Sequence, residues 1–340
     1  MIQSRSKSFS GIIPRARQRG VALLMVLFAF ALASILATAI LSRQNLFLKK
    51  TAVILQQSQA QEYATAVEQF ARQILYRDYE EDKRNNEFTD DLKEYWAGNS
   101  LIIPFGNAIL ESQIDDLQAR LNLNDIVNND GTANQFVIKR FKNLFELLEI
   151  KELTVEKIQD WIDPDSEAVN GDGGEDNLYL IKDPGYRTAN ADFQDISELK
   201  LVDGVTAEIY QKLLPHVTVL PRGMGGVNIN TCSKEVLQSL PPKALDESRV
   251  DELVEERSKE PIKKAQEFLA LPAWAGSGIQ DKEVRVNSEF FQVSTRVTLG
   301  DRVSRLVSVF QRDKNGKLTL MSRNFGQKYI ITKQSFSLPE

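Results

Sequence analysis

The sequence predicts an α+β protein in which one long N-terminal helix is followed by a strand, a helical block and a closing set of antiparallel strands. No proline or glycine interrupts residues 21–78, as a continuous helix requires. The side chains of residues 108–114 have the two-residue alternation that is typical of a strand. Residues 286–325 are rich in β-branched side chains, which are also typical of strands. Short amphipathic segments separated by turn residues occupy most of residues 134–285, which indicates helices.

The composition limits the possible functions. The 340 residues are 42% hydrophobic and 26% charged, which is ordinary for a globular protein and argues against wholesale disorder. Residues 1–20 carry five basic residues and no acid, so the rest of the chain has a formal charge of −10 instead of −5. A body this acidic repels phosphate backbones. One cysteine, Cys232, and one histidine, His216, cannot form a structural zinc site or an intramolecular disulfide within one chain.

The start of the long helix is a candidate membrane span. No charged residue occurs from Val21 to Leu41, and a helix of this length spans about 30 Å, the thickness of a bilayer's hydrocarbon core. The basic residues before it favour a cytoplasmic N-terminus and a translocated body. Arg43, Lys49 and Lys50 weaken this bias without reversing it. After the span, apolar residues continue at about helical spacing to Leu75, so the helix becomes amphipathic.

A cleaved secretory signal is the alternative. The small-x-small triplets at 31–33 and 37–39 fit signal peptidase, and cleavage there gives a soluble exported protein that starts near Ile40. The apolar run is longer than the usual 7–15 residues of a signal peptide. It also continues into the amphipathic part of the helix, which favours a helix that is kept.

The basic leader, the glycine at its end and the uninterrupted apolar helix together resemble type IV pilin-like proteins. In that class a prepilin peptidase cuts after the glycine, here between Gly20 and Val21, and methylates the new N-terminus. Most pilins carry glutamate at the fifth mature position, where this chain has Met25. A charge within the bilayer costs roughly 2.5–3.5 kcal/mol and is kept only where it has a partner or a role. The absence of this glutamate is consistent with a subunit that has no further subunit beyond it in the filament.

Two later stretches resemble the K subunit family of the type II secretion system, which are minor pseudopilins. They are "IDDLQARLNLNDIV" (114–127) and residues 161–221 with the following "VNINTCSKEVLQSL". The resemblance implies a pilin-like fold, a long N-terminal helix packed on an antiparallel sheet, with a large all-helical insertion. The implied parts are a cleaved leader (1–20), a transmembrane segment (21–41), the rest of the helix with the first strand (42–120), the insertion (121–285), the C-terminal strands (286–325) and a loose tail (326–340).

The same resemblance implies a function in assembly. The family is placed at the tip of the pseudopilus with the I and J minor pseudopilins, and this filament helps export folded proteins across the outer membrane. The expected partners also include the prepilin peptidase and the inner-membrane assembly platform. The chain is then a single-pass protein of the Gram-negative inner membrane with a periplasmic body. Its helix is expected to present an apolar face to partner helices, with the contributing residues Met25, Val53, Val67, Phe70 and Ile74.

An acidic, glycine-rich loop in the insertion is a candidate calcium site. Within 14 residues it carries six carboxylates: Asp163, Asp165, Glu167, Asp172, Glu175 and Asp176. Ca²⁺ takes six to eight oxygen ligands on a backbone that can curl around it. The spacing is not that of an EF-hand, because the sixth position from Asp163 is Ala168. The alternative is a solvated acidic loop. K subunits are associated with calcium in this part of the insertion, so the resemblance favours Ca²⁺.

Two other classes of function are less consistent with the sequence. The segment 227–271 resembles a helix-hairpin-helix module of exported, competence-like DNA-binding proteins. Its turn, Pro241-Pro242-Lys243, has prolines that cannot donate an amide to a phosphate. A second such turn keeps Gly204 but places Asp203 beside it, so both are expected to be packing modules for protein contacts, without nucleic acid. No enzyme is expected, because the sequence has no P-loop, G-x-S-x-G, H-E-x-x-H or Cys/His pair.

Overall fold

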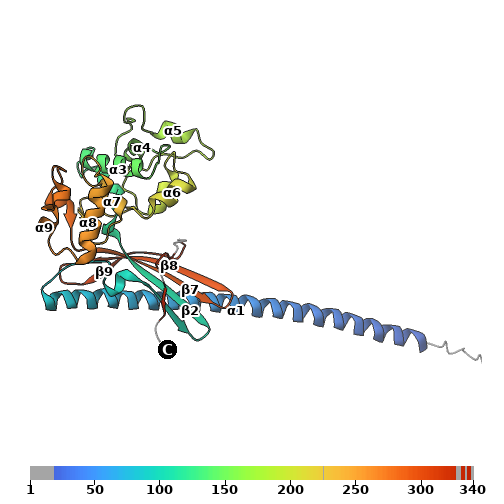
Figure 1. Ribbon diagram of the computed structural model, residues 1–340. Coiled ribbons are helices and arrows are strands. Elements are labelled where there is room, and N and C mark those ends of the chain that lie inside the picture. Colours follow the sequence, from blue (N-terminus) through green and yellow to red (C-terminus); the bar gives the residue numbers. More distant parts are fainter. Residues whose placement is uncertain (1–18, 225, 327–330, 334, 338–340) are drawn as a thin grey trace, which may run out of the picture. The chain divides into compact units, whose positions relative to one another are not determined.

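The computed structural model describes residues 19–224, 226–326, 331–333 and 335–337 (Figure 1). The leader lies almost wholly outside these residues. Two compact units divide the chain, one ending at Ser58 and one beginning at Gln59. Helix α1 (Arg19–Asn85) contributes to both units and has 67 residues, so it is about 100 Å long. This confirms the predicted continuous helix.

The described part of the first unit is the N-terminal part of α1. Among the described residues, the helix from Val21 is long and apolar enough to cross a membrane, with a mean hydropathy of 2.6 over its most apolar 18 residues. None of that window is buried within the protein. This agrees with the predicted membrane span.

A six-stranded sheet forms the base of the second unit, in the order β10-β1-β2-β7-β8-β9. Neighbouring strands are antiparallel, except that β10 runs parallel to β1. The strands are β1 (Ser100–Phe105), β2 (Ala108–Asp116), β7 (Phe290–Leu299), β8 (Arg302–Arg312), β9 (Leu318–Asn324) and β10 (Ser335–Ser337). The alternating stretch 108–114 and the β-branched C-terminal stretch therefore form strands, as the sequence predicts.

The part of α1 in the second unit lies along one face of this sheet (Figure 1). Three of its buried residues are alanines, with Ala60, Ala64 and Ala71 at most 1% exposed. They share two apolar clusters with inward-facing residues of the sheet, among them Leu306 and Phe310. Small side chains allow the helix to approach the strands closely, so the helix and the sheet form one core.

One carboxylate is buried in this interface. Glu68 of α1 is fully buried and accepts hydrogen bonds from Arg323 Nε (2.8 Å) and Nη2 (2.6 Å), and from the Ser308 hydroxyl. Arg323 lies on β9 and Ser308 on β8. The ion pair therefore fixes the helix against the last two strands.

The insertion connects β2 to β7 and has its own apolar core, which includes Phe141, Ile158 and Tyr179. Its α-helices are α3 (Gln135–Leu147), α4 (Val155–Ile162), α5 (Asp176–Leu180), α6 (Ala207–Leu213), α7 (Lys234–Ser239), α8 (Glu247–Lys259) and α9 (Ala265–Leu269). Short helical turns lie at η1 (Leu117–Ala119), η2 (Leu123–Ile126), η3 (Ile196–Leu201), η4 (Pro272–Trp274) and η5 (Asp281–Glu283), and α2 (Tyr95–Gly98) precedes β1. Two parallel pairs of two-residue strands, β3 (Leu121–Asn122) with β4 (Val217–Thr218) and β5 (Val227–Asn228) with β6 (Val284–Arg285), interrupt the expected all-helical character.

Both helix-hairpin-helix-like turns pack within the insertion. Gly204 has φ +88°, and a Cβ there would lie 2.3 Å from the carbonyl oxygen of Glu152. The neighbouring Asp203 pairs with Lys157 and Lys182, each at 2.8 Å. At the other turn, the Pro241 carbonyl accepts a hydrogen bond from Asn143 Nδ2 (2.9 Å). These contacts agree with packing modules.

The segment expected to be a loose tail contains a strand. β10 pairs with β1 through the register Ser100 to Ser335, Leu101 to Phe336 and Ile102 to Ser337. Without it, β1 would present an unpaired edge of backbone amides and carbonyls. The expectation for residues 326–340 is corrected to this extent.

The Glu68–Arg323 pair yields a prediction. Replacing Arg323 with Ala leaves a buried carboxylate without its counter-ion, which is expected to cost about 2–3 kcal/mol of unfolding free energy, because the arginine is partly exposed. Adding Glu68→Gln in the same chain removes the stranded charge and is expected to recover part of this loss. The measurement is the thermal unfolding of the full-length protein in detergent. Arg302→Ala, at an exposed position of β8, is the matched control. A stability change for R323A no larger than for R302A would contradict the assigned role.

Candidate functional site

The end of helix α4 positions two of the three carboxylates in the candidate metal site. Thr154 caps the start of α4 by accepting a hydrogen bond from the Lys157 amide, and the helix ends at Ile162. Asp160 lies in its last turn and Asp163 directly follows it. Residues three apart on a helix lie on one side, so these two carboxylates face the same way.

The loop after α4 brings the third carboxylate to them. Glu175 stands immediately before α5, and its side chain is 4% exposed, against 0% for Asp160 and 3% for Asp163. One carboxylate oxygen from each residue lies within 4.8 Å of the other two. The site is therefore a compact group of three buried acids.

Backbone amides fold the loop around Asp160. Its Oδ2 accepts a hydrogen bond from the Gly174 amide (2.7 Å), and both of its oxygens are within 3.2 Å of the Val169 amide nitrogen. Gly173 is required by this arrangement, because a Cβ there would lie 2.1 Å from Asp160 Oδ2. Gly173 and Gly174 thus allow the loop backbone to approach the Asp160 carboxylate closely.

The electrostatics of this group are unbalanced. Burial, and then the neighbouring carboxylates, raise the pKa of Asp163 to about 6 and that of Glu175 to about 7. Asp163 Oδ1 and Glu175 Oε1 are buried without any hydrogen-bond partner. A buried charge without a partner costs several kcal/mol. Unpartnered carboxylate oxygens that converge are the donor set that a hard cation such as Ca²⁺ takes, so the residues fit this ion.

The structure unites two of the six acids that the sequence indicated, Asp163 and Glu175. Asp165, Glu167 and Asp172 are exposed. Asp176 instead binds Arg187 (2.9 Å) and the amide of Thr188 (3.0 Å). These four lie outside the group of three.

Asp160 is the member that sequence reasoning missed, because it belongs to the helix before the acidic loop and not to the loop itself. Its spacing of one helical turn from Asp163 was the available signal.

The residues expected to contact partner helices divide into two sets. Met25, Val53 and Phe70 are 66%, 36% and 42% exposed. Val67 and Ile74 are only 4% and 9% exposed, because they pack against the sheet of the same chain. The expectation of a partner-facing role is corrected for Val67 and Ile74.

The predicted processing site lies at the start of α1. Gly20 and Val21 are the second and third residues of the helix, and the Val21 side chain is 55% exposed. Residues 1–18 of the predicted leader lie outside the described residues.

His216 has a structural environment. It is 8% exposed, and its Nδ1 lies 2.9 Å from the Ser233 hydroxyl, which caps α7. Burial lowers its pKa. His216 therefore has a packing role beside the cap of α7.

Comparison with known proteins identifies the family. Family models described as "Type II secretion system (T2SS), protein K" match residues 119–222 and 227–287. The type II secretion system protein K of Pseudomonas aeruginosa is 35% identical over 92% of this chain and 94% of its own length. That of Klebsiella pneumoniae is 31% identical over 92% of this chain and 98% of its own length.

A solved structure has the same fold. The GspK-GspI-GspJ complex from the enterotoxigenic Escherichia coli type 2 secretion system contains a chain that aligns with a TM-score of 0.69 at 23% identity. The alignment covers 82% of this chain and all of that one. Together with the sequence matches, which extend over nearly the whole length, this shows that the chain belongs to the protein K family of the type II secretion system.

Proposed function

We propose that this protein is a minor pseudopilin of the type II secretion system. The observation that carries the proposal is the single helix α1, which has an unburied apolar N-terminal part and a C-terminal part packed on a pilin-like sheet. Such a helix anchors the subunit in a membrane and then packs against other helices in a filament. Family membership supports the same role.

The protein is inserted once in the inner membrane, with its N-terminus in the cytoplasm and its body in the periplasm. Prepilin peptidase removes residues 1–20 and methylates Val21. The I and J minor pseudopilins are its partners, which the composition of the solved GspK-GspI-GspJ complex supports, and the assembly platform delivers it to the filament. Met25 in place of the usual glutamate supports a position at the tip.

Assembly and not catalysis is the role of this chain. Of the five residues of α1 predicted to contact helix partners, Met25, Val53 and Phe70 are exposed. The insertion sits on the body as a second folded mass, which would block further subunits from adding above it. Export of folded proteins across the outer membrane is the process that this filament serves.

Calcium is the ion that we propose for the site at the end of α4. Asp160, Asp163 and Glu175 would hold it, and backbone carbonyls or waters would complete its coordination. When bound, the ion neutralises the converging carboxylates. The chain's own contribution is to fix α4 and α5 at the distance that the three side chains require.

The processing site can be tested directly. Replacing Gly20 with Val is expected to abolish cleavage, because the peptidase recognises the glycine before the cut. The measurement is the N-terminal mass of protein recovered from the membranes of the native host, expected to begin at methylated Val21 in the wild type. G11V, which changes another leader glycine, is the control and should be processed normally.

Two results would contradict this assignment. A wild-type chain that begins near Ile40 would indicate a secretory signal, and normal maturation of G20V would remove the glycine from the recognition site.

The calcium site is tested by the melting temperature of the full-length protein in detergent, with Ca²⁺ or with a chelator. At a Ca²⁺ concentration 100-fold above the dissociation constant, the expected stabilisation is about 2.7 kcal/mol, a rise of a few degrees. Asp163→Asn and Glu175→Gln should each lose most of this rise. Asp172→Asn should keep it, since that residue lies outside the group of three.

The fluorescence of Trp161 provides a second readout. It lies between Asp160 and Asp163 in the chain and packs edge-on against Tyr179 (5.2 Å between ring centroids). An unchanged rise in D163N, or an equal loss in D172N, would contradict the proposed ligand set.

A further inference from the structure

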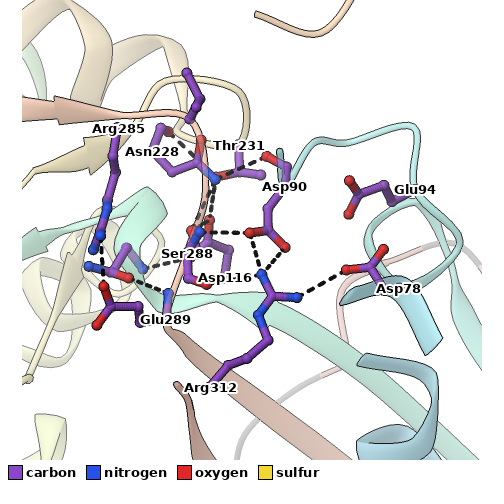
Figure 2. Close-up of polar contacts among 12 residues, drawn as sticks. Asp78, Asp90, Glu94, Asp116, Asn228, Thr231, Arg285, Ser288, Glu289 and Arg312 are labelled. Carbon is purple, nitrogen blue, oxygen red and sulfur yellow. Dashed lines mark hydrogen bonds and ion pairs between the residues drawn. The ribbon is translucent and has the colours of Figure 1, made fainter. Parts of the chain in front are cut away.

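A buried polar cluster lies where the insertion joins the sheet. The chain leaves the sheet at Asp116, the end of β2, and returns at Ser288, two residues before β7. We call this cluster the clasp (Figure 2). Its members come from six separate parts of the chain: Asp78, Asp90, Glu94, Asp116, Asn228, Thr231, Ser288 and Arg312.

Asp116 connects the point where the chain leaves the sheet to the point where it returns, and also to the insertion. Its Oδ2 accepts hydrogen bonds from Thr231 Oγ1 (2.6 Å), Ser288 Oγ (2.6 Å) and Asn228 Nδ2 (3.0 Å). Asn228 Nδ2 also lies 3.0 Å from the carbonyl oxygen of Asp90. The segment 228–231 of the insertion is therefore hydrogen-bonded directly to the end of β2 and to the segment before β7.

Arg312 supplies the positive charge of the clasp. Its guanidinium donates to both oxygens of Asp90, to Asp78 (3.1 Å) and to the Ser288 carbonyl (3.0 Å). It also lies over the ring of Phe291, 4.6 Å from the centroid. Arg312 thus connects α1, the segment after it and the return point of the insertion.

Carboxylates outnumber cations here. One oxygen each of Asp78, Asp90 and Glu94 lie within 4.8 Å of one another. The carboxylates that face the clasp are Asp78 and Asp82 from α1, Asp90, Asp91 and Glu94 from the segment after it, and Asp116 from β2. The nearby cations besides Arg312 are partly occupied: Arg285 pairs with Glu289 (2.9 Å), and Lys333 lies over Trp96 and near Asp115 (3.8 Å).

We propose that the clasp is a proton-sensitive lock, which carries a carboxylic proton in the pair Asp78–Glu94 at neutral pH and loosens the attachment of the insertion when that proton leaves. Two partly buried carboxylates this close, with one guanidinium beside them, cannot both ionise without a large cost in free energy. The neutral form of the pair relieves the repulsion, while Asp90 keeps its contact with Arg312. Loss of the proton adds another negative charge beside the segments through which the insertion leaves β2 and returns to β7.

The pKa values of the acids in and around the clasp support the loss of a proton as the pH rises. Burial, followed by the charges of Asp78 and Asp90, raises the pKa of Glu94. Burial raises the pKa of Asp90 to about 7 against the opposing effect of Arg312, and burial and Asp78 raise that of Asp82 to about 7. The folded protein therefore binds more protons than the unfolded chain between about pH 4 and pH 7. Its stability is full at the acidic end of this range and falls as the pH rises through about 7.

The test is the melting temperature of the full-length protein in detergent from pH 5.5 to pH 8.5, with a chelator present. The wild type is expected to lose on the order of 5 °C over this range. Glu94→Gln keeps a neutral side chain of the same shape and cannot ionise, so it should melt higher than the wild type at pH 8.5. Glu208→Gln, which changes an exposed carboxylate of α6, is the control and should follow the wild type.

Amide hydrogen exchange, corrected for its intrinsic pH dependence, gives the local readout. Residues 117–119 and 286–289 should lose protection at pH 8.5 in the wild type but not in E94Q. A wild-type melting temperature that is flat or rises with pH, or an E94Q variant that melts no higher than the wild type at pH 8.5, would overturn the proposal. It would also be overturned if Ca²⁺ at pH 8.5 stabilised the wild type and D163N but not E94Q, because the cluster would then take a cation and not a proton.

Discussion

The close packing of α1 on the sheet is the interaction on which the body of this protein depends. Ala60, Ala64 and Ala71 present almost no side chain beyond Cβ, so the helix approaches the strands closely enough for Glu68 to reach Arg323 on β9. The helix and the last strands are more than 200 residues apart in sequence. Their contact therefore joins the parts of the chain before and after the insertion, whose two ends emerge from the neighbouring strands β2 and β7.

Two groups of buried carboxylates solve the same electrostatic problem differently. At the end of α4, Asp160, Asp163 and Glu175 converge, and Asp163 and Glu175 each have one oxygen without a hydrogen-bond partner, so a metal ion can supply the missing charge. In the clasp, Arg312 already occupies the centre, so the excess negative charge is relieved by a proton. The first group would stabilise the interior of the insertion and the second its attachment to the sheet. In their proposed roles, the first group would respond to the calcium concentration and the second to pH.

The fold was largely predictable because its signals are local. The absence of proline and glycine predicted α1, and alternation predicted β2. The group of three acids was predictable in part, since loop acids indicated Asp163 and Glu175 but a helical residue, Asp160, was not considered; calcium as its ion stays a prediction. The clasp had no such signal, because its residues extend from Asp78 to Arg312 and buried polar groups follow no period.

The apolar stripe of α1 shows why periodicity alone could not assign partners. Val53, Ala60, Val67 and Ile74 recur every seven residues, so they lie close to one face of the helix. The sheet buries this face from Ala60 onward, whereas Val53 remains 36% exposed. One stripe thus has two environments: the chain's own sheet takes its later positions, and its earlier position is free for another helix. Phe70 lies off this stripe, so a partner that contacts it must approach the helix from another side. The two predicted contact residues Val53 and Phe70 therefore lie on different faces of α1, and only the face of Val53 carries the buried stripe that begins at Ala60.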